Sequence, residues 1–459
     1  MTVRRYTADL IFFDGRFQPD AALLVDDAGR ITSIGSSSAV QLPEGATDEH
    51  LEGAVLPGAV NAHSHAFQIL LRGAADAATD FRDWVDNYMY PLSLSLDAGG
   101  LAMASRLAFA EMLKNGVTTV GEFFYLHNAP ENAGCAPRGN RNAEIVIGAA
   151  RSVGIRIHLL RCLYDRAERT GQRRFYESAE NAVTATEALA ASCATSPGVS
   201  VGIAPHSLHG ATADGIVAAA DFARRHDQPF QIHLAEEEHD LPYARDHYGT
   251  TPGRVLDELG VVSQRLCVVH GVWLDHDEID LLGAAGAKCA YNPISNMALG
   301  DGVTDIPAMV EAGMTVALGC DGPGANHQVN VWQEMRFVEW LQRVTRRRMN
   351  ILLQPQAATT ANYCFELGTR NGGTVLGLPV GELRPGFCAD FVVVDLTDPS
   401  LLPHHGPDPA ALLHNVVHSM DARGAVTDVF VDGRAVVRAR TLVHADEREL
   451  ARLAGEWHC

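Results

Sequence analysis

The feature that most constrains the fold of this chain is a repeated alternation between short apolar runs and amphipathic helical stretches. The runs are rich in Val, Ile, Leu and Ala, and a helical stretch follows each of them. The eight runs are Val55–Asn61, Thr118–Phe123, Ile155–Cys162, Val199–Pro205, Pro229–His233, Leu266–His270, Ala287–Tyr291 and Thr315–Cys320. Runs that are apolar on both faces are typical of strands in a parallel sheet covered by helices. Eight such units in succession predict an α/β fold, a closed (β/α)8 TIM barrel.

Both ends of the chain show a different, all-β pattern. Near the N-terminus we predict short strands at 8–13, 22–27 and 30–35, with no helical pattern between them. The runs 389–395 and 426–437 near the C-terminus have the same character, and Asp432-Gly433 is a strong hairpin signal. We therefore predict a small β-sandwich-like module built from both chain ends. Its predicted parts are 1–57 and 376–440, with the barrel at 58–375 and a C-terminal helix at 441–459.

Composition disfavours several classes of function. The 56 Asp and Glu residues outnumber the 36 Lys and Arg residues and give a formal net charge of −20, which argues against nucleic acid and anionic membranes as partners. No apolar stretch has the length of a membrane span or a signal peptide, so we expect a cytoplasmic protein. The nine cysteines are scattered without a CxxC pair, which predicts buried free thiols. These properties suit an enzyme that acts on small neutral or cationic molecules.

Metal-capable side chains stand at the ends of four predicted strands. Residues two apart in an extended chain project to the same face, so His63 and His65 can bind one ion together. Surface or core histidines explain an isolated His-x-His pair equally well. However, His233, His270 and Asp321 end three further strands. Because the chemistry of a barrel collects at the carboxyl ends of its strands, these five side chains predict a metal centre there.

Two acidic residues near these strand ends have alternative interpretations. Glu236 follows His233 by three residues, close enough to face the same cavity and to move a proton. It could instead be a first-turn acid that favours the helix dipole. Asp321 could ligate an ion or take a proton from metal-bound water, or it could simply cap a helix.

The order and spacing of these residues resemble the amidohydrolase superfamily. The matching segments are His63-Ser-His65, the step from His233 to Glu236, Val268-Val-His270, Asn292-Pro-Ile-Ser-Asn296 and Asp321-Gly322. They are most similar to the aminohydrolase branch, which holds triazine hydrolases, adenosylhomocysteine deaminases and formimidoylglutamate deiminases. The resemblance covers nearly the whole chain, including the segment 381–390 that leads back into the β-module.

The resemblance implies a site for one metal ion. The ion is usually Zn²⁺, with Fe²⁺ or Mn²⁺ as alternatives, and the implied ligands are His63, His65, His233 and Asp321. A second ion is not expected, because His206 stands at the end of the fourth strand where a bridging lysine would be. The resemblance also implies a homodimer.

The implied reaction adds metal-activated water to an sp² carbon that bears nitrogen, and it releases ammonia. Asp321 would accept a proton from the water, and Glu236 would protonate the departing nitrogen. His270 would stabilise the tetrahedral intermediate by donating a hydrogen bond, a role worth roughly 3 kcal/mol for one donor.

Several segments resemble the formimidoylglutamate deiminases in particular. They are 65–68, 121–127, 171–175 and 205–208. By this resemblance, Gln68, Tyr125 and His206 line the substrate pocket. The alternatives are that Tyr125 packs with its hydroxyl in water and that Gln68 caps a loop.

The residues that would bind the carboxylates of glutamate depart from that group. His209 stands where the group has an arginine, and Asp86 stands near a second expected arginine in the lid after the first strand. We predict that both contact the substrate, and Asp86 suits a neutral or basic tail. Arg72, Arg82 and Arg173 could compensate if they turn inward.

Three hypotheses about function follow. The leading one is a metal-dependent aminohydrolase of a formimidoyl or amidine-type small molecule. The segment 320–326 instead resembles the adenosylhomocysteine and nucleobase deaminases, so the alternative is deamination of a heteroaromatic amine such as an adenosine derivative, guanine, a pterin or a triazine. The third is a metal-free scaffold protein, which the complete set of ligands disfavours.

Overall fold

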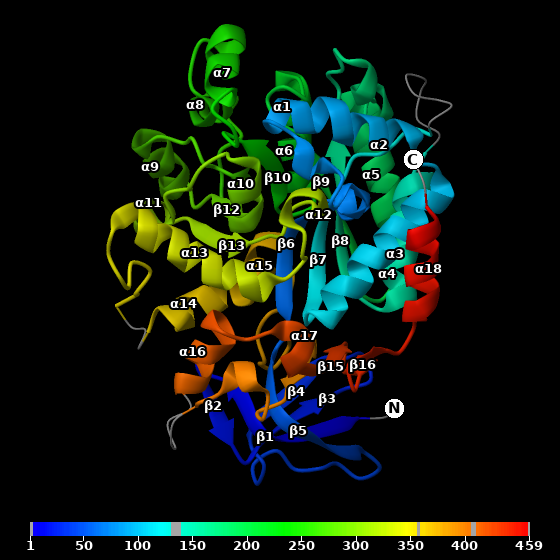
Figure 1. Ribbon diagram of the computed structural model, residues 1–459, viewed down its shortest axis with the longest axis vertical. Helices are drawn as coiled ribbons and strands as arrows, with labels where there is room; N and C mark the ends of the chain where they lie inside the picture. The colour runs from blue at the N-terminus through cyan, green and yellow to red at the C-terminus, as the bar shows by residue number, and fades with distance from the viewer. Residues whose placement is uncertain (1–2, 130–138, 356–358, 405–409, 458–459) are drawn as a thin grey trace.

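The computed structural model describes residues 3–129, 139–355, 359–404 and 410–457, and it shows a barrel standing on a β-module (Figure 1). Within these ranges, eight parallel strands form two four-stranded sheets in the orders β6-β7-β8-β9 and β10-β11-β12-β13. Their bounds are β6 (Ala59–Ser64), β7 (Val117–Phe124), β8 (Arg156–Leu163), β9 (Val199–Pro205), β10 (Phe230–Leu234), β11 (Leu266–His270), β12 (Lys288–Tyr291) and β13 (Thr315–Leu318). Every residue of β7 and β8 is buried, as expected for strands covered on both faces.

Two backbone contacts close the two sheets into one barrel. The amide of His233 on β10 donates to the carbonyl of His206, just past β9, at 3.0 Å. On the other side, Ser64 of β6 forms a parallel bridge with Asp321, just past β13. The predicted (β/α)8 barrel is confirmed.

The first predicted strand differs from the structure. The run Val55–Asn61 spans two strands, because β5 (Thr47–Pro57) belongs to the β-module and β6 begins at Ala59 in the barrel. The amide of Gly58 between them donates to Asp390 of the module at 3.0 Å, and that of Ala59 donates to Gly116 at 3.1 Å. Both strands are buried here, so the apolar pattern continues without a polar residue to mark the change of sheet.

Helices surround the barrel on its outer face. The main ones are α3 (Ala98–Lys114), α4 (Arg141–Val153), α5 (Ala179–Cys193), α6 (Ala213–Arg225), α8 (Pro252–Glu258), α9 (His276–Ala284), α11 (Ile306–Glu311), α13 (Val331–Arg346) and α14 (Thr360–Leu367). The short helix α15 (Arg370–Leu376) instead contacts β6, β12 and β13, and its Val375 packs with Val269 and Ala290. Side chains of Asp97, Ser178, Thr212 and Asp275 precede four of these helices and accept a backbone N–H from the first turn. Such caps satisfy amides that have no partner within the helix.

Short helices cover the end of the barrel that lies away from the module (Figure 1). The segment after β6 supplies η1 (Ala66–Leu71), η2 (Ala75–Ala77), α1 (Phe81–Trp84), η3 (Val85–Met89) and α2 (Tyr90–Ser95). Later segments supply η5 (Thr170–Arg174), α7 (Asp240–Tyr248), α10 (Pro293–Leu299) and α12 (Pro323–Asn326). The strands run from the module towards this end, so their carboxyl ends open under these helices.

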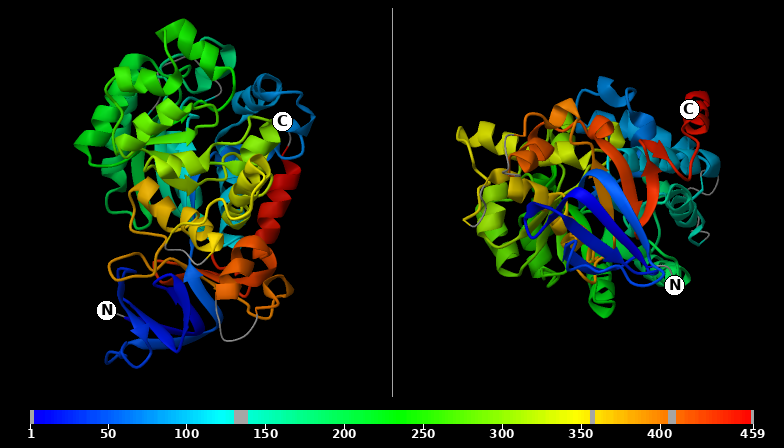
Figure 2. Two further views of the ribbon diagram at one scale, coloured as in Figure 1. Left: turned by 90° about the vertical axis from the view of Figure 1, so that its left-hand side faces the viewer. Right: turned by 90° about the horizontal axis from the view of Figure 1, so that it is seen from below.

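The module contains strands from both ends of the chain, and it covers the opposite end of the barrel (Figure 2). Its described strands form one nine-stranded sheet in the order β17-β16-β15-β14-β5-β1-β3-β4, with β2 paired to β1. Besides β5, they are β1 (Arg4–Phe13), β2 (Arg16–Pro19), β3 (Ala21–Val25), β4 (Ile31–Ser36), β14 (Phe391–Val394), β15 (Val426–Val431), β16 (Arg434–Arg438) and β17 (Thr441–Leu442). The sheet curls around a shared core in which Tyr6, Phe391 and Phe430 pack with ring centroids 4.3–5.4 Å apart.

The remaining elements join the module to the barrel. They are η6 (Pro399–Leu401), α16 (Ala410–His418), α17 (Ala422–Ala425) and α18 (Glu447–Glu456). Lys114 of α3 reaches Glu447 of α18 at 2.5 Å. We propose that the boundaries between the module, the barrel and the C-terminal helix lie at residues 57, 375 and 440.

Two further sequence predictions can be compared with the described residues. Seven of the nine cysteines lie in the described ranges, where all are buried and free, whereas Cys135 and Cys459 lie outside them. In the same ranges, none of the helices has the length and the apolar character needed to cross a bilayer.

A buried ion cluster holds the module against the barrel. Arg156 at the start of β8 donates to Asp390 of the module through Nε at 2.7 Å and through Nη2 at 3.0 Å, and it also contacts Asp432. The backbone amide of Asp432 donates to Asp390 at 2.8 Å. Bidentate contacts of this kind fix both the position and the orientation of the two parts.

Replacing Arg156 with Ala leaves Asp390 buried without a counter-charge. Because an unpaired buried charge is costly, we expect the free energy of unfolding to fall by about 3–5 kcal/mol. Urea denaturation followed by circular dichroism measures this change. The control is Arg225→Ala, which breaks an exposed 2.7 Å pair with Glu187 and should cost less than about 1 kcal/mol. Equal losses in the two variants would contradict the importance of the buried cluster.

Candidate active site

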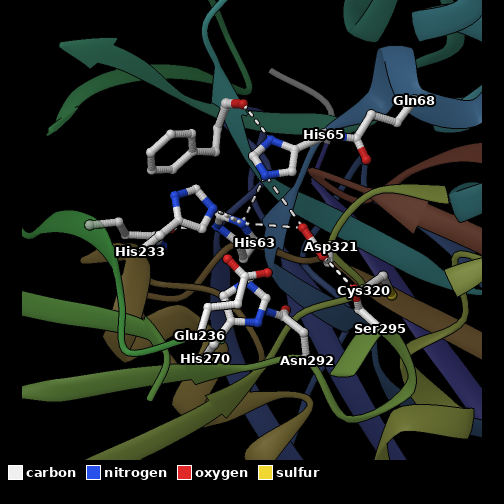
Figure 3. Close-up of polar contacts among 12 residues, drawn as sticks. His63, His65, Gln68, His233, Glu236, His270, Asn292, Ser295, Cys320 and Asp321 are labelled. Carbon is white, nitrogen blue, oxygen red and sulfur yellow. Dashed lines mark hydrogen bonds and ion pairs between the residues drawn. The ribbon is translucent and has the colours of Figure 1, made fainter. Parts of the chain in front are cut away.

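Three histidines bring their Nε2 atoms to one point at the mouth of the barrel (Figure 3). His63 and His65 come from the end of β6, and His233 comes from β10. The Nε2 of His63 lies 3.2 Å from that of His65 and 3.2 Å from that of His233. All three side chains are buried, so water does not separate them from one another.

The outer nitrogen of each ring faces an oxygen. The Nδ1 atoms lie 3.0 Å from Gln231 Oε1 for His63, 2.9 Å from the carbonyl of Phe123 for His65 and 2.9 Å from the carbonyl of His206 for His233. The side chain of Gln231 is itself fixed, because its Nε2 donates to the carbonyl of Ala62 at 2.9 Å. Each Nδ1 therefore carries the proton of a neutral ring.

This protonation pattern fits a cation. With hydrogen on Nδ1, the three Nε2 atoms all present lone pairs and none can donate to another. Burial lowers the pKa of His65 to about 3 and holds that of His233 well below its usual range, so these rings stay neutral and able to ligate. The group is thus a ready-made set of nitrogen ligands at the spacing that a divalent transition metal needs.

Asp321 adds an oxygen to this group. Its Oδ1 lies 3.6 Å from His63 Nε2 and 3.4 Å from His65 Nε2, while its Oδ2 accepts from Ser295 Oγ at 2.5 Å. Its backbone has a φ of 58°, an unusual value for Asp, and its amide donates to the carbonyl of His63 at 2.9 Å. Burial opposes ionisation, but the surrounding imidazoles of His63, His65 and His270 hold the pKa of Asp321 below its usual value.

Glu236 and His270 form a pair beside the ligand group. Glu236 Oε1 lies 3.3 Å from His270 Nε2, which is buried and has no aligned hydrogen-bond partner among the described residues. Burial raises the pKa of Glu236 well above its usual value, and the nearby carboxylates of Asp301 and Asp321 raise it further. The raised pKa favours the protonated form of Glu236, which can donate its proton to a group in the cavity.

A cavity of about 310 Å³ opens above these residues. His65, His233, Glu236 and Asp321 form part of its floor. Its wall is largely aromatic and contains Phe81, Trp84, Tyr90, Tyr125, Tyr164, Phe175 and Tyr243. A concave space lined by aromatic side chains, with convergent polar groups at its floor, is typical of a small-molecule site.

The predicted substrate residues divide into two sets. Gln68, Tyr125, His206 and His209 all lie in the cavity wall, and Gln68 Nε2 donates to the Tyr125 hydroxyl at 2.8 Å. The described part of the cavity wall does not include Asp86, whose carboxylate instead accepts from Arg169 Nη1 at 2.5 Å on the rim.

The three arginines that could replace the missing carboxylate-binding arginines do not lie together in the cavity. Arg72 donates to both oxygens of Glu111, at 2.9 and 3.2 Å, on the outside of the barrel. Arg173 is exposed, and only Arg82 lies in the cavity wall.

Sequence reasoning missed several residues that support the site. Gln231 was within reach of the same rule that found His63 and His65, since it lies two residues before His233 in a strand. Ser295 and Asn296 lie in a matched motif but had no assigned contact. Asp301 follows in a loop and carried no pattern that could have identified it.

The sequence model of the Amidohydrolase family matches residues 54–436. The chain belongs to the amidohydrolase family.

Its relatives share nearly its whole length. A 5-methylthioadenosine/S-adenosylhomocysteine deaminase of Syntrophobacter fumaroxidans is 30% identical over 95% of this chain and 94% of its own. A 5'-deoxyadenosine deaminase of Methanopyrus kandleri is 29% identical over 94% of this chain and 93% of its own. The crystal structure of an adenosine deaminase of Xanthomonas campestris with bound zinc has a TM-score of 0.85, is 24% identical, and covers 99% of this chain and 97% of its own. The predictions of the aminohydrolase branch and of a hydrolase acting on non-peptide carbon–nitrogen bonds are confirmed.

Replacing Gln231 with Leu tests the way in which His63 is oriented. The variant removes the acceptor for His63 Nδ1, so we expect affinity for Zn²⁺ to fall about 10- to 100-fold, the usual effect of losing such a partner. Competition with a chromophoric chelator measures the affinity. Gln231→Glu keeps an acceptor oxygen and should lose much less. Unchanged affinity in Gln231→Leu would show that the hydrogen bond does not hold the ligand.

Proposed function

We propose that this protein is a zinc-dependent hydrolase that removes the exocyclic amino group of an adenosine derivative as ammonia. The observation that carries the proposal is the Glu236–His270 pair beside a converging nitrogen ligand group, at the floor of an aromatic cavity. Curated relatives named as deaminases of adenosine derivatives support it. They favour the heteroaromatic alternative over the formimidoyl hypothesis that led from the sequence.

The side chains on the floor divide the reaction between them. When bound, a divalent ion lowers the pKa of a coordinated water to about 7 and so makes a nucleophile available at neutral pH. His63, His65, His233 and Asp321 would hold the ion, and the carboxylate of Asp321 would take the proton that the water releases. A new carbon–oxygen bond forms at the ring carbon, and the carbon–nitrogen bond to the amino group breaks.

Glu236 and His270 act on the substrate rather than on the ion. The protonated carboxyl of Glu236 donates to the nitrogen as it departs, which allows it to leave as neutral ammonia. His270 Nε2 faces the same point and donates a hydrogen bond to the developing negative charge. The pair thus supplies a proton and a fixed donor on one side of the reacting carbon.

The cavity wall favours a purine. Tyr125, Tyr164 and Phe175 form a continuous set of rings, with centroids 4.9 Å apart for Tyr125–Phe175 and 5.4 Å apart for Tyr164–Phe175. Flat aromatic surfaces stack well on a flat heteroaromatic base. Gln68 and His206 contribute polar edges near the floor.

Among the described residues, the cavity wall contains two arginines, Arg82 and Arg169. Arg169 is paired with Asp86, and the charge of Arg82 lies close enough to Glu237 to act on its pKa. Burial and Asp240 raise the pKa of Glu237, while Arg82 opposes them. We therefore propose that the substituent on the ribose is neutral or cationic and not an amino acid.

A formimidoyl compound is the second candidate. The Gln68–Tyr125 contact and the position of His206 in the wall both match what that resemblance implies. The scaffold hypothesis is disfavoured, because three histidines with bare inward nitrogens would have no role in it. We also propose, from the family resemblance, that the chain works as a homodimer. The apolar pattern of the sequence and its net charge of −20 support a cytoplasmic protein that acts on a small molecule, without nucleic acid or membrane as partner.

A substrate series tests the proposal directly. Ammonia release should be measured for the zinc-loaded protein with adenosine, 5'-deoxyadenosine, 5'-methylthioadenosine, S-adenosylhomocysteine and formimidoylglutamate. We expect kcat/KM for the uncharged 5' derivatives to exceed that for S-adenosylhomocysteine by at least about tenfold, which corresponds to about 1.4 kcal/mol for an unmatched tail. A clear preference for formimidoylglutamate would reject the proposal in favour of the second candidate.

Glu236→Gln tests the proton donor. The amide keeps the size of the side chain but cannot deliver a proton, so we expect zinc content to stay unchanged and kcat to fall about 100- to 10,000-fold. Metal analysis and steady-state kinetics measure the two quantities. His233→Ala is the contrasting variant and should lose both the metal and turnover. An active, metal-free His233→Ala protein would contradict the assigned ligand set.

A further inference from the structure

The turn Asn292-Pro-Ile-Ser-Asn296 follows β12 and opens α10, and the proposed function has not used it. Asn292, Ser295 and Asn296 are all fully buried, although each is polar. Ser295 donates to Asp321, as described above. The two asparagines face His270 instead.

Asn296 makes two contacts through one nitrogen. Its Nδ2 lies 3.0 Å from His270 Nδ1 and 2.8 Å from Asp301 Oδ2. Asn292 Nδ2 lies 3.4 Å from the same His270 nitrogen. The backbone of His270 is also held, because its carbonyl accepts from Thr304 Oγ1 at 2.9 Å.

The partner at Asp301 decides which way the Asn296 amide faces. Burial raises the pKa of Asp301 to about 7, so above that pH its carboxylate is ionised and can only accept. The NH₂ group of Asn296 must then point towards Asp301, and its second hydrogen points to His270. A nitrogen that receives a hydrogen bond has no proton of its own, so the neutral ring of His270 carries its proton on Nε2.

The proton on His270 thus sits on the opposite nitrogen from those on the three ligand histidines. Their Nδ1 atoms face oxygens, and their Nε2 atoms are bare. His270 Nε2 carries hydrogen, lies 3.3 Å from Glu236 Oε1, and cannot serve as a metal ligand. One site therefore contains both kinds of neutral imidazole, and the group that faces the outer nitrogen of each ring determines which kind it is.

We propose that Asn296, oriented by Asp301, is a positioning residue that fixes the tautomer of His270 so that Nε2–H points into the cavity. Its neighbour Ser295 donates to Asp321 from the same turn. One short segment therefore orients both the proposed metal ligand Asp321 and the hydrogen-bond donor His270. The assignment of the tautomer rests on the contacts of Asn296 with His270 and with the carboxylate of Asp301. Only its effect on turnover rests on the proposed function.

The size of that effect follows from what a wrong tautomer does. With hydrogen moved to Nδ1, His270 would present a lone pair where negative charge develops in the reaction. In a hydrolase whose histidine is forced into the wrong tautomer, turnover falls about 10,000-fold while the geometry stays intact. We expect a loss of about 100- to 10,000-fold here, in kcat and not in KM.

The wild-type protein provides the first test. Protein labelled with ¹⁵N in histidine and loaded with zinc is studied by long-range ¹H–¹⁵N NMR at pH 8, without substrate. The signal of His270 is identified by its loss in His270→Asn. We expect a protonated Nε2 and a bare Nδ1 for this ring, and a protonated Nδ1 for the three ligands. A protonated Nδ1 on His270 would overturn the inference.

An exchange of two side chains provides the second test. The double variant Asn296→Asp/Asp301→Asn keeps the composition and the net charge of the pair but places an acceptor against His270 Nδ1. We expect Nδ1 to gain a proton, kcat to fall about 100- to 10,000-fold, and KM and zinc content to change less than about threefold. The matched control is Asp301→Asn alone, which still offers an amide oxygen to Asn296 and should keep the wild-type tautomer.

The outcomes separate this inference from the proposed function. A bare Nδ1 in the double variant, or an altered tautomer with unchanged kcat, overturns the positioning role. If the double variant does not fold, the wild-type spectrum and the Asp301→Asn control still decide the tautomer. The expected tautomer together with no release of ammonia from any adenosine derivative would reject the proposed function and leave the assignment of His270 intact.

Discussion

The direction of the hydrogen bonds around four buried imidazoles is the constraint on which this site depends. A neutral imidazole has one proton for two nitrogens, so the partner on its outer side decides what its inner side can do. Oxygens from Gln231, β7 and the end of β9 leave lone pairs pointing inwards on three rings. An amide nitrogen leaves an N–H pointing inwards on the fourth. A closed barrel suits this arrangement, because neighbouring strands present backbone carbonyls at fixed positions beside His65 and His233.

Much of the barrel could be predicted because buried parallel strands have a simple pattern. The predicted runs at 199–205 and 266–270 coincide with β9 and β11, and the other later runs differ from their strands only at the ends. The run 55–61 could not be divided from sequence, because burial on both faces makes the end of one strand look like the start of the next. The module was predicted from its hairpin and turn signals, but the long strand β5 that joins its two parts was not.

The site was predictable where its residues stand on strands and less so where they stand on loops. His63, His65, His233 and His270 were found because strand ends converge in a barrel. Asp301 lies in a loop after α10, where no periodicity relates its sequence position to its place in space. Asp86 lies in η3, one of the short helices after β6, and its side chain is turned to Arg169 on the rim. The segments after the strands also surround the part of the cavity that would hold the distal end of the substrate. Short motifs in these segments favoured a formimidoyl compound, whereas comparison over the whole chain favoured an adenosine derivative.

The pairing of β5 with β14 has a consequence for the newly made chain. Val55 lies opposite Val393, and Pro57 lies opposite Phe391, so the middle of the module sheet joins segments from opposite ends of the polypeptide. During synthesis the N-terminal strands are made first. The edge of β5 that pairs with β14 therefore has no partner until β14 has left the ribosome. Open apolar edges pair readily with other chains, so the pairing of β14 with β5 also removes an edge at which the unfinished chain could aggregate.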